Sequence, residues 1–333
     1  MSRSDEHVLL GDIGASNARF AVLSNGQIGP IRYFSVAEFP RFTDVVDAFW
    51  RNDCERLSIR QAVLAVAGPV EADRCELTNC TWTVDARELC TAFGLASVRV
   101  CNDFEAAALS LPHLTAADLH RLGGGAARSG APMVVLGPGT GLGVAGLVPG
   151  PDGPVVIAGE GGHASMAAGS AREDAVITHL RRQFGHVSAE RVVSGSGLEN
   201  LYRAIIALDG IAAPRRDAAA ITGAALDGDC PTAEAALELF CAMLGAFAGN
   251  AALTFGARGG VYIAGGIAPR ITRFMERSQF RARFEDKGRF HGYLAAIPTS
   301  IIVHPAATFV GLRTLASHDT EAAAGYRRSA EQH

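Results

Sequence analysis

The stretch LLGDIGASNARFAVL, residues 9–23, constrains the fold more than any other part of the sequence. Two apolar runs flank a glycine-rich turn, and the second run, ARFAVL, has the composition of a strand. A nucleotide-binding loop of the common strand–loop–helix kind needs a helix at that place. The stretch therefore predicts a β-hairpin, whose turn region carries Asp12, Ser16, Asn17 and Arg19.

The same design returns at VVLGPGTGLGVAGLV, residues 134–148, where a turn containing glycine and threonine again separates two apolar runs. A third glycine turn follows in GGVYIAGGIAPRI, residues 259–271. Two hairpins of one design predict a duplicated fold whose halves face each other. The alternative is that two unrelated hairpins occur by chance in one α/β chain.

The first third of the chain alternates between strand-like and helix-like segments, which predicts an α/β domain with a largely parallel sheet. Strands are expected at 8–13, 18–23, 61–68 and 98–102, and helices at 42–51, 85–94 and 104–111. In the second half, helices are expected at 173–185 and 234–256, a glycine-rich loop at 122–132, and a frayed polar tail at 317–333.

Composition narrows the class of protein further. With 333 residues, 48% of them hydrophobic, the chain can bury a large core in two domains or one duplicated unit. A net charge of -4 gives no attraction to nucleic acid. We find neither a signal peptide nor a run of about 20 apolar residues, so we expect a cytoplasmic protein without a membrane anchor.

The seven cysteines are isolated and form no C-x-x-C pair. Reduced, buried thiols are the favoured interpretation. A zinc site at Cys75 and Cys80 is the alternative, which their loose spacing makes the weaker one.

Glycine-rich turns expose backbone N–H groups, and clusters of such groups bind phosphate oxygens. Ser16 and Thr140 add hydroxyl donors at equivalent places in the two hairpins. Asp12, an acid at such a turn, suits a phosphate ligand when Mg²⁺ lies between them. The chain lacks the lysine of a P-loop, and a G-x-G-x-x-G match at 141–146 continues as a strand, which argues against a dinucleotide site.

Asp103 follows the strand VRVCN directly and immediately precedes the helix FEAAALSL. Helix capping is one role for an aspartate at that place. The other is that of a general base, because open α/β sheets bind ligands at the carboxyl ends of their strands. Asn102 beside it, together with the glycine turns, favours a base for phosphoryl transfer.

Glu160 and His163 lie in the glycine turn GEGGHASMAA, which we expect to be non-helical. A carboxylate and an imidazole in a glycine-rich turn suit a polyhydroxylated ligand, because each hydroxyl needs both a donor and an acceptor. Coordination of a metal ion by Glu160 and His163 is the weaker alternative. Glu190 is either a further ligand-binding acid or a surface acid on a helix. Ser196 and Glu199 have the spacing of a capping box that opens the helix LENLYRAI.

Taken in order, GDIGASNAR, NDF, GPGTGLGVA, GEGGH, ERVVSGSGLENLYRAI, GGVYIAGGIAPR, FRARFEDKGRF and IIVH resemble the bacterial glucokinases over nearly the whole chain. The resemblance implies a duplicated actin-like ATPase (ribonuclease H-like) fold, shared with hexokinase and Hsp70, with two α/β domains flanking a cleft. It implies a small domain at 1–113 plus 304–333, and a large domain at 114–303. The family is commonly a homodimer.

The resemblance also implies the reaction and its residues. ATP, as its Mg²⁺ complex, would phosphorylate D-glucose at the 6-hydroxyl, a step of glycolysis, with Asp103 as catalytic base. Asn102, Glu160, His163 and Glu190 would hold the other sugar hydroxyls. The ATP phosphates would lie on the first glycine turn, formed by Gly11, Asp12, Ile13, Gly14, Ala15, Ser16 and Asn17. They would also contact the second turn, formed by Gly139, Thr140 and Gly141. The adenosine would lie near the third turn, at Gly265 and Gly266. Asp12 would meet the metal indirectly, through Mg·ATP.

Three positions depart from the family pattern GDxGGTNAR and its partner turn. Ala15 and Ser16 replace glycine and threonine, and if position 15 requires a positive φ the methyl group costs about 1 kcal/mol. Pro138 removes one amide donor from the second turn. The rival hypotheses are a kinase for mannose, fructose or an N-acetylated hexosamine, a catalytically weak sugar sensor, and an actin-like or chaperone ATPase.

Overall fold

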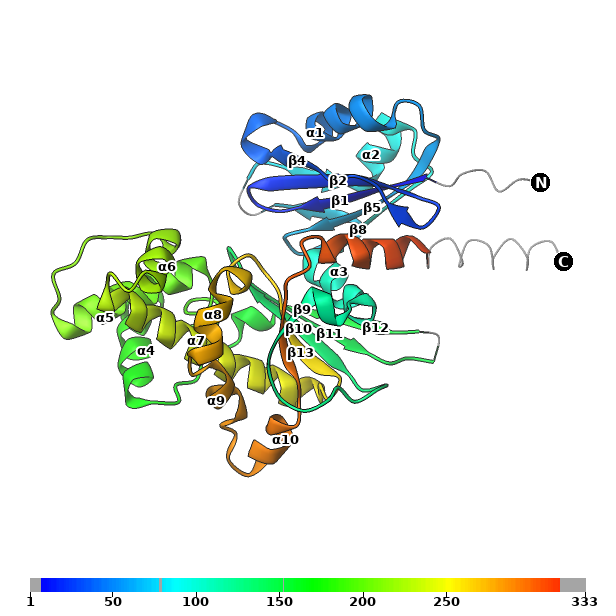
Figure 1. Ribbon diagram of the computed structural model, residues 1–333. Coiled ribbons are helices and arrows are strands. Elements are labelled where there is room, and N and C mark those ends of the chain that lie inside the picture. Colours follow the sequence, from blue (N-terminus) through cyan, green and yellow to red (C-terminus); the bar gives the residue numbers. More distant parts are fainter. Residues whose placement is uncertain (1–6, 78–79, 152, 318–333) are drawn as a thin grey trace. The chain divides into compact units, whose positions relative to one another are not determined.

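The computed structural model describes residues 7–77, 80–151 and 153–317 (Figure 1). The chain forms two compact units, residues 1–113 with 305–333 and residues 114–304. Of the polar tail expected at 317–333, everything beyond Ser317 lies outside the described residues.

The first unit contains a sheet with the strand order β3-β2-β1-β5-β8, in which β4 also pairs with β2. Its strands are β1 His7–Ile13, β2 Asn17–Ser24, β3 Gln27–Ile28, β4 Arg32–Ser35, β5 Ile59–Val66 and β8 Ser97–Asn102. β1 and β2 pair antiparallel from His7 opposite Ser24 to Ile13 opposite Ala18, which confirms the first hairpin. β1, β5 and β8 are parallel, as the alternating pattern predicts.

Capping side chains and glycines set the ends of helices in this unit. They are α1 Phe42–Phe49, α2 Ala86–Phe93 and α3 Asp103–Ser110, with short turns of helix at Val36–Glu38, Trp50–Cys54 and Leu111–His113, and a small hairpin of β6 Arg74–Glu76 and β7 Thr83–Asp85. Asp85 caps α2 by accepting from the Arg87 amide at 2.8 Å. Gly94, with a φ of 66°, ends it in the left-handed conformation that favours glycine.

The second unit contains a sheet with the strand order β12-β11-β10-β13-β14-β9. Its strands are β9 Leu119–Gly123, β10 Met133–Pro138, β11 Leu142–Val148, β12 Val155–Gly159, β13 Gly260–Ile263 and β14 Thr299–Ile302. β10 and β11 pair antiparallel up to Pro138 opposite Leu142, which confirms the second hairpin. The expected loop at 122–132 begins later than predicted, because Gly123 still pairs with Thr299 in the sheet.

Helices of the second unit form a layer beside its sheet (Figure 1). They are α4 Ala171–Phe184, α5 Gly195–Asp209, α6 Ala218–Leu226, α7 Pro231–Phe255, α8 Thr272–Arg277, α9 Phe280–Glu285 and α10 His291–Ala295, with 3₁₀ turns at Ala116–Asp118, Gly161–His163, Ala268–Ile271 and Gly288–Phe290. α7 is long and apolar enough to cross a membrane, which the sequence analysis did not anticipate. Its most apolar window is 78% buried inside the protein, as in a core helix.

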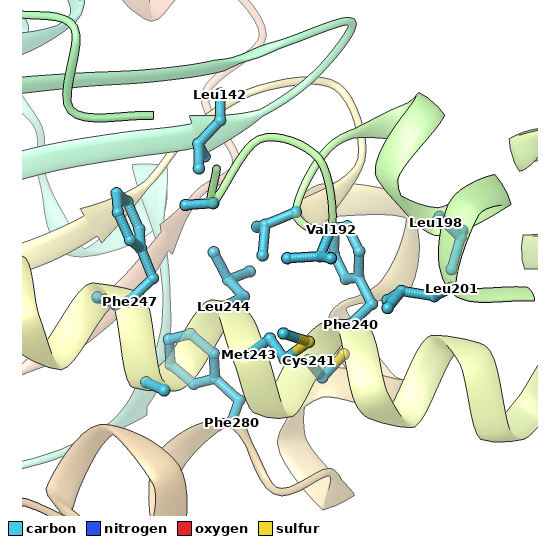
Figure 2. Close-up of a cluster of buried hydrophobic side chains, with 14 of the residues drawn as sticks. Leu142, Val192, Leu198, Leu201, Phe240, Cys241, Met243, Leu244, Phe247 and Phe280 are labelled. Atoms are coloured by element: carbon cyan, nitrogen blue, oxygen red, sulfur yellow. The ribbon is translucent and has the colours of Figure 1, made fainter. Parts of the chain in front are cut away.

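The core of the second unit gathers around α7 (Figure 2). Phe240, Met243, Leu244 and Phe247 project from this helix among side chains of the neighbouring elements. Leu142, the first residue of β11, is part of the same core. The first unit has a separate core, so each unit buries its own apolar surface.

Candidate active site

The parallel register of the first unit aligns three candidate segments at one edge of its sheet. Ile13 lies opposite Val66, and Val66 lies opposite Asn102. The Ala67 amide donates to the Ile13 carbonyl at 3.0 Å, which extends the alignment by one residue. The first glycine turn and the Asn102–Asp103 pair therefore lie at the same carboxyl edge, where open α/β sheets bind ligands.

The first glycine turn is held by backbone hydrogen bonds. The Gly14 amide donates to the Asn17 carbonyl at 2.9 Å, and the Val36 amide donates to the Ser16 carbonyl at 3.0 Å. Ala15 is not among the described non-glycine residues with positive φ, which are Asn25, Ala72 and Asp73. The backbone cost considered for an alanine at this position therefore does not arise.

Asp12 is a buried carboxylate, 7% exposed, that forms an ion pair with Arg19 across the hairpin. Burial raises the pKa of Asp12, while the charge and hydrogen bond of Arg19, and a hydrogen bond from Thr308, act in the opposite direction. Arg19 also donates to the Pro305 carbonyl at 3.2 Å and lies 5.8 Å from the centre of the Phe309 ring.

Residues 307–317 are helical, so the end of the chain supports the first turn. These contacts of Arg19 and Thr308 were not predicted from the sequence. No local sequence motif predicts these contacts, because the partners are almost 300 residues apart. The nearest signal was the family resemblance, which places the C-terminal helix in the same domain as the first turn.

One buried carboxylate at a glycine turn fits a magnesium ion that is carried by a nucleotide. Among the described residues, no group of three or more His, Cys, Asp or Glu side chains could hold a metal alone. Mg²⁺ is commonly bound through one or two carboxylates together with substrate phosphates and water. Asp12 supplies one such carboxylate, which pairs with Arg19 in this structure.

Asn102, rather than Asp103, is the N-cap residue of α3. Its side-chain oxygen accepts from the Phe104 amide at 2.9 Å, and its Nδ2 donates to the Gly68 carbonyl at 3.0 Å. Asp103 is the first residue of the helix, and its Oδ1 also accepts from Phe104, at 3.0 Å. The capping role considered for Asp103 is therefore filled by its neighbour.

In the second unit, three segments meet at the second glycine turn. The Gly139 amide donates to the Gly141 carbonyl at 2.9 Å, and the Gly195 amide at the start of α5 donates to the Gly139 carbonyl at 2.8 Å. Gly265, with a φ of 82°, passes so close to Pro138 that a Cβ would lie 2.5 Å from its carbonyl oxygen. Only glycine fits there.

Glu160 and His163 form a loose pair, with 3.8 Å between Oε2 and Nε2, and both side chains are exposed. Gly161–His163 is one turn of 3₁₀ helix, so the prediction of a non-helical turn is wrong. The turn is tight because a Cβ on Gly162 would lie 2.0 Å from the Leu142 carbonyl oxygen.

Glu190 lies in a turn that precedes α5, so the alternative of a surface acid on a helix is wrong. Its Oε2 accepts from the Leu142 amide at 2.9 Å, and its own amide donates to the Gly162 carbonyl at 2.9 Å. Glu160, His163 and Glu190 are thus brought to one place in this unit, beside the second glycine turn.

The predicted capping box at Ser196 and Glu199 is wrong, because α5 begins earlier. Ser194 is the N-cap, and its Oγ accepts from the Gly197 amide at 2.9 Å. The Glu199 carboxylate instead accepts from the Ala218 amide at 3.3 Å, at the start of α6. Sequence spacing alone fits either serine, and the contact between Gly195 and Gly139 decides where the helix begins.

Comparisons with known proteins agree on one family. A family model described as Glucokinase matches residues 9–319. The glucokinase of Paramagnetospirillum magneticum is 46% identical over 311 residues, 92% of this chain and 97% of that protein. The chain therefore belongs to the glucokinase family, a family of sugar kinases.

Solved structures agree on the fold. A glucokinase from an Antarctic psychrotroph has a TM-score of 0.83 at 35% identity, covering 92% of this chain and 97% of that one. A ROK family glucokinase from Streptomyces griseus, solved with glucose and AMPPNP, has a TM-score of 0.62 at 18% identity and covers 93% and 98% of the two chains. The second likeness concerns the fold alone.

Proposed function

We propose that this protein transfers the γ-phosphoryl group of ATP to the 6-hydroxyl of D-glucose. The observation that carries the proposal is the sheet register that aligns the Asp12 turn with the Asn102–Asp103 pair, in a chain of the glucokinase family. Phosphoryl transfer needs a base for the attacking hydroxyl and donors around the phosphates.

Each candidate residue has a role in this reaction. Asp103 accepts the proton of the 6-hydroxyl as that oxygen attacks the γ-phosphorus. Asn102, Glu160, His163 and Glu190 bind the remaining hydroxyls, which need both donors and acceptors. The amides of 11–17 and 139–141 receive the phosphates, and Gly265 and Gly266 allow the adenosine to approach the backbone closely.

The nucleotide brings its own cation. When bound, Mg²⁺ neutralises charge on the phosphate oxygens. Asp12 would hold it from the protein side, and the AMPPNP complex of the Streptomyces griseus enzyme supports ATP as the donor.

We further propose a duplicated actin-like architecture, in which the two units flank the cleft that receives both substrates. Each sheet contains a hairpin followed by two parallel strands, β2-β1-β5-β8 in one and β11-β10-β13-β14 in the other, which supports duplication. Closure on glucose would exclude water, which otherwise competes as the phosphoryl acceptor. The protein would act in glycolysis as a homodimer in the cytoplasm. Its seven free cysteines agree with a reducing compartment.

The decisive experiment measures ADP release from Mg·ATP by the purified protein, with and without glucose. We expect strong stimulation by glucose, with glucose 6-phosphate as the product. Background ADP release in the presence of bound glucose would overturn the proposal and favour a sugar sensor. A panel of mannose, fructose and N-acetylglucosamine tests the preference for glucose, since a site that binds each hydroxyl rejects analogues strongly.

A further inference from the structure

Glu190 has two separate contacts with the backbone around the second glycine turn. Its Oε2 accepts from the Leu142 amide at 2.9 Å, one residue after that turn ends. The same oxygen would lie 2.6 Å from a Cβ on Gly141, so the carboxylate is packed directly against the turn. A bond from a backbone N–H to an ionised carboxylate is among the stronger hydrogen bonds of proteins.

The segment around Glu190 is itself fixed, so the carboxylate is not a mobile surface group. The Glu190 amide donates to Gly162, and the Glu190 carbonyl accepts from the Ser194 hydroxyl at 2.8 Å. Ser194 is fully buried, and the next residue, Gly195, donates to the Gly139 carbonyl at 2.8 Å. The backbone around Glu190 is thus held at both ends against the residues that build the turn.

Leu142 joins this arrangement to the core. Its side chain is buried in the α7 cluster together with that of Val192, two residues after Glu190 (Figure 2). A displacement of Leu142 would therefore disturb packed side chains as well as its hydrogen bond. The position of the Leu142 amide is consequently a well-defined feature of this unit.

We propose that Glu190 is a positioning residue for the nucleotide as well as a ligand of the sugar. This inference rests on the proposed function, which assigns glucose to Glu190 and phosphates to the turn at 139–141. Oε2 holds the Leu142 amide and with it the turn, and Oε1 serves the sugar hydroxyl. One carboxylate thus connects the two substrates within a single unit.

A consequence is that the two substrates favour each other's binding. A sugar hydroxyl on Oε1 restrains the carboxylate, and the restrained carboxylate holds the turn in the conformation that receives phosphate. Coupling of binding free energies is reciprocal, so bound nucleotide must raise sugar affinity by the same factor.

Three variants separate the two roles. Glu190→Ala removes both oxygens, whereas Glu190→Gln keeps one carbonyl oxygen for the Leu142 amide and presents an NH₂ group to the sugar. His163→Ala is the matched control, because its imidazole belongs to the same sugar group but lies near Glu160 rather than against the turn.

The first measurement is the affinity for Mg·AMPPNP by calorimetry, with no sugar present. We expect Glu190→Ala to bind about tenfold more weakly than wild type, because the hydrogen bond that holds the Leu142 amide is lost. Glu190→Gln, which keeps a neutral hydrogen bond to that amide, and His163→Ala should bind within about twofold of wild type. Glucose affinity should fall in all three variants. Wild-type affinity of Glu190→Ala for the analogue would overturn the inference.

The second measurement needs no ligand. Hydrogen exchange followed by mass spectrometry should show faster exchange of the 138–142 segment in Glu190→Ala, and wild-type exchange in Glu190→Gln. If wild type fails to bind the analogue, the proposed function fails, while the exchange comparison still decides whether Glu190 holds the turn. Equal exchange in wild type and Glu190→Ala would overturn the link itself.

Discussion

At the scale of single residues, Asp103 and its neighbour Asn102 have different structural roles. Asn102 uses both ends of its amide to cap α3 and bind Gly68. Asp103 follows the cap and is the first residue of the helix. The sequence order Asn-Asp thus assigns the N-cap to Asn102 and leaves the next residue, Asp103, as the proposed base.

Replacing Asp103 by alanine should abolish phosphoryl transfer while leaving glucose binding largely intact. A general base contributes about 10²–10⁴-fold to the rate, so kcat should fall by at least that range. Turnover is measured by ADP release and glucose affinity by calorimetry. Near-normal turnover would remove Asp103 as the base.

Arg19 is the cation that makes a buried Asp12 tolerable. Arg19→Met should destabilise the protein by about 2 kcal/mol, because it leaves the buried Asp12 carboxylate without its hydrogen-bonding partner. Asp12→Asn in the same background should restore much of the loss, as urea unfolding of the single and double variants would reveal. Additive effects of the two changes would show that the ion pair contributes nothing.

The pH dependence of this loss follows from the direction of the pKa shift. Burial raises the pKa of Asp12, and Arg19 acts against that rise. Without Arg19 the folded protein holds the Asp12 proton to higher pH than the unfolded chain does. The loss in Arg19→Met should therefore be greatest at neutral pH and shrink toward about pH 4. A loss independent of pH would point to packing against Phe309 instead.

At the scale of elements, the start of α5 matters because it contacts the second glycine turn. Ser194→Ala should lower the free energy of unfolding by about 1 kcal/mol, the usual contribution of an N-cap side chain. Ser196→Ala is the matched control and should change it by less than half as much, since within the described part of the chain the Ser196 hydroxyl bonds to the Ser194 hydroxyl and caps no backbone amide. Urea unfolding of the two variants measures the difference. Equal losses of unfolding free energy would contradict Ser194 as the N-cap and favour the capping box at Ser196 and Glu199.

At the scale of the whole molecule, each unit has its own core, and each core contains a buried cysteine. Cys54 lies in the core of the first unit and Cys241 in that of the second. Burial raises the pKa of both thiols to about 12, so both should resist alkylation in the native state. Cys80, Cys90 and Cys230 are more exposed and should react first.

Glucose should protect Cys54 and Cys241 during alkylation in urea. The proposed sugar residues come from both units, and a ligand stabilises whatever binds it, by about 2.7 kcal/mol at a hundredfold excess over Kd. Peptide mass spectrometry of alkylated Cys54 and Cys241 measures this. Protection of Cys241 alone would place the sugar site within the second unit and exclude a role for Asn102 and Asp103.

Local pattern was sufficient for much of this protein. Both hairpins, the parallel strands that follow the first, and the helices α1, α2, α3, α4 and α7 could be predicted, because alternation and apolar periodicity are properties of consecutive residues. The candidate residues were also identified from short motifs. The comparisons confirm the family that those motifs indicated.

Tertiary structure decided what no window of sequence contains. The contact of Gly195 with Gly139 places the start of α5 at Ser194, and α7 is a core helix because the rest of its unit surrounds it. Arg19 meets Pro305, and Glu190 meets Leu142, across 286 and 48 residues of chain. Such pairings depend on which surfaces fold together, since the energy of burying a charge or satisfying an amide is set by neighbours in space rather than in sequence.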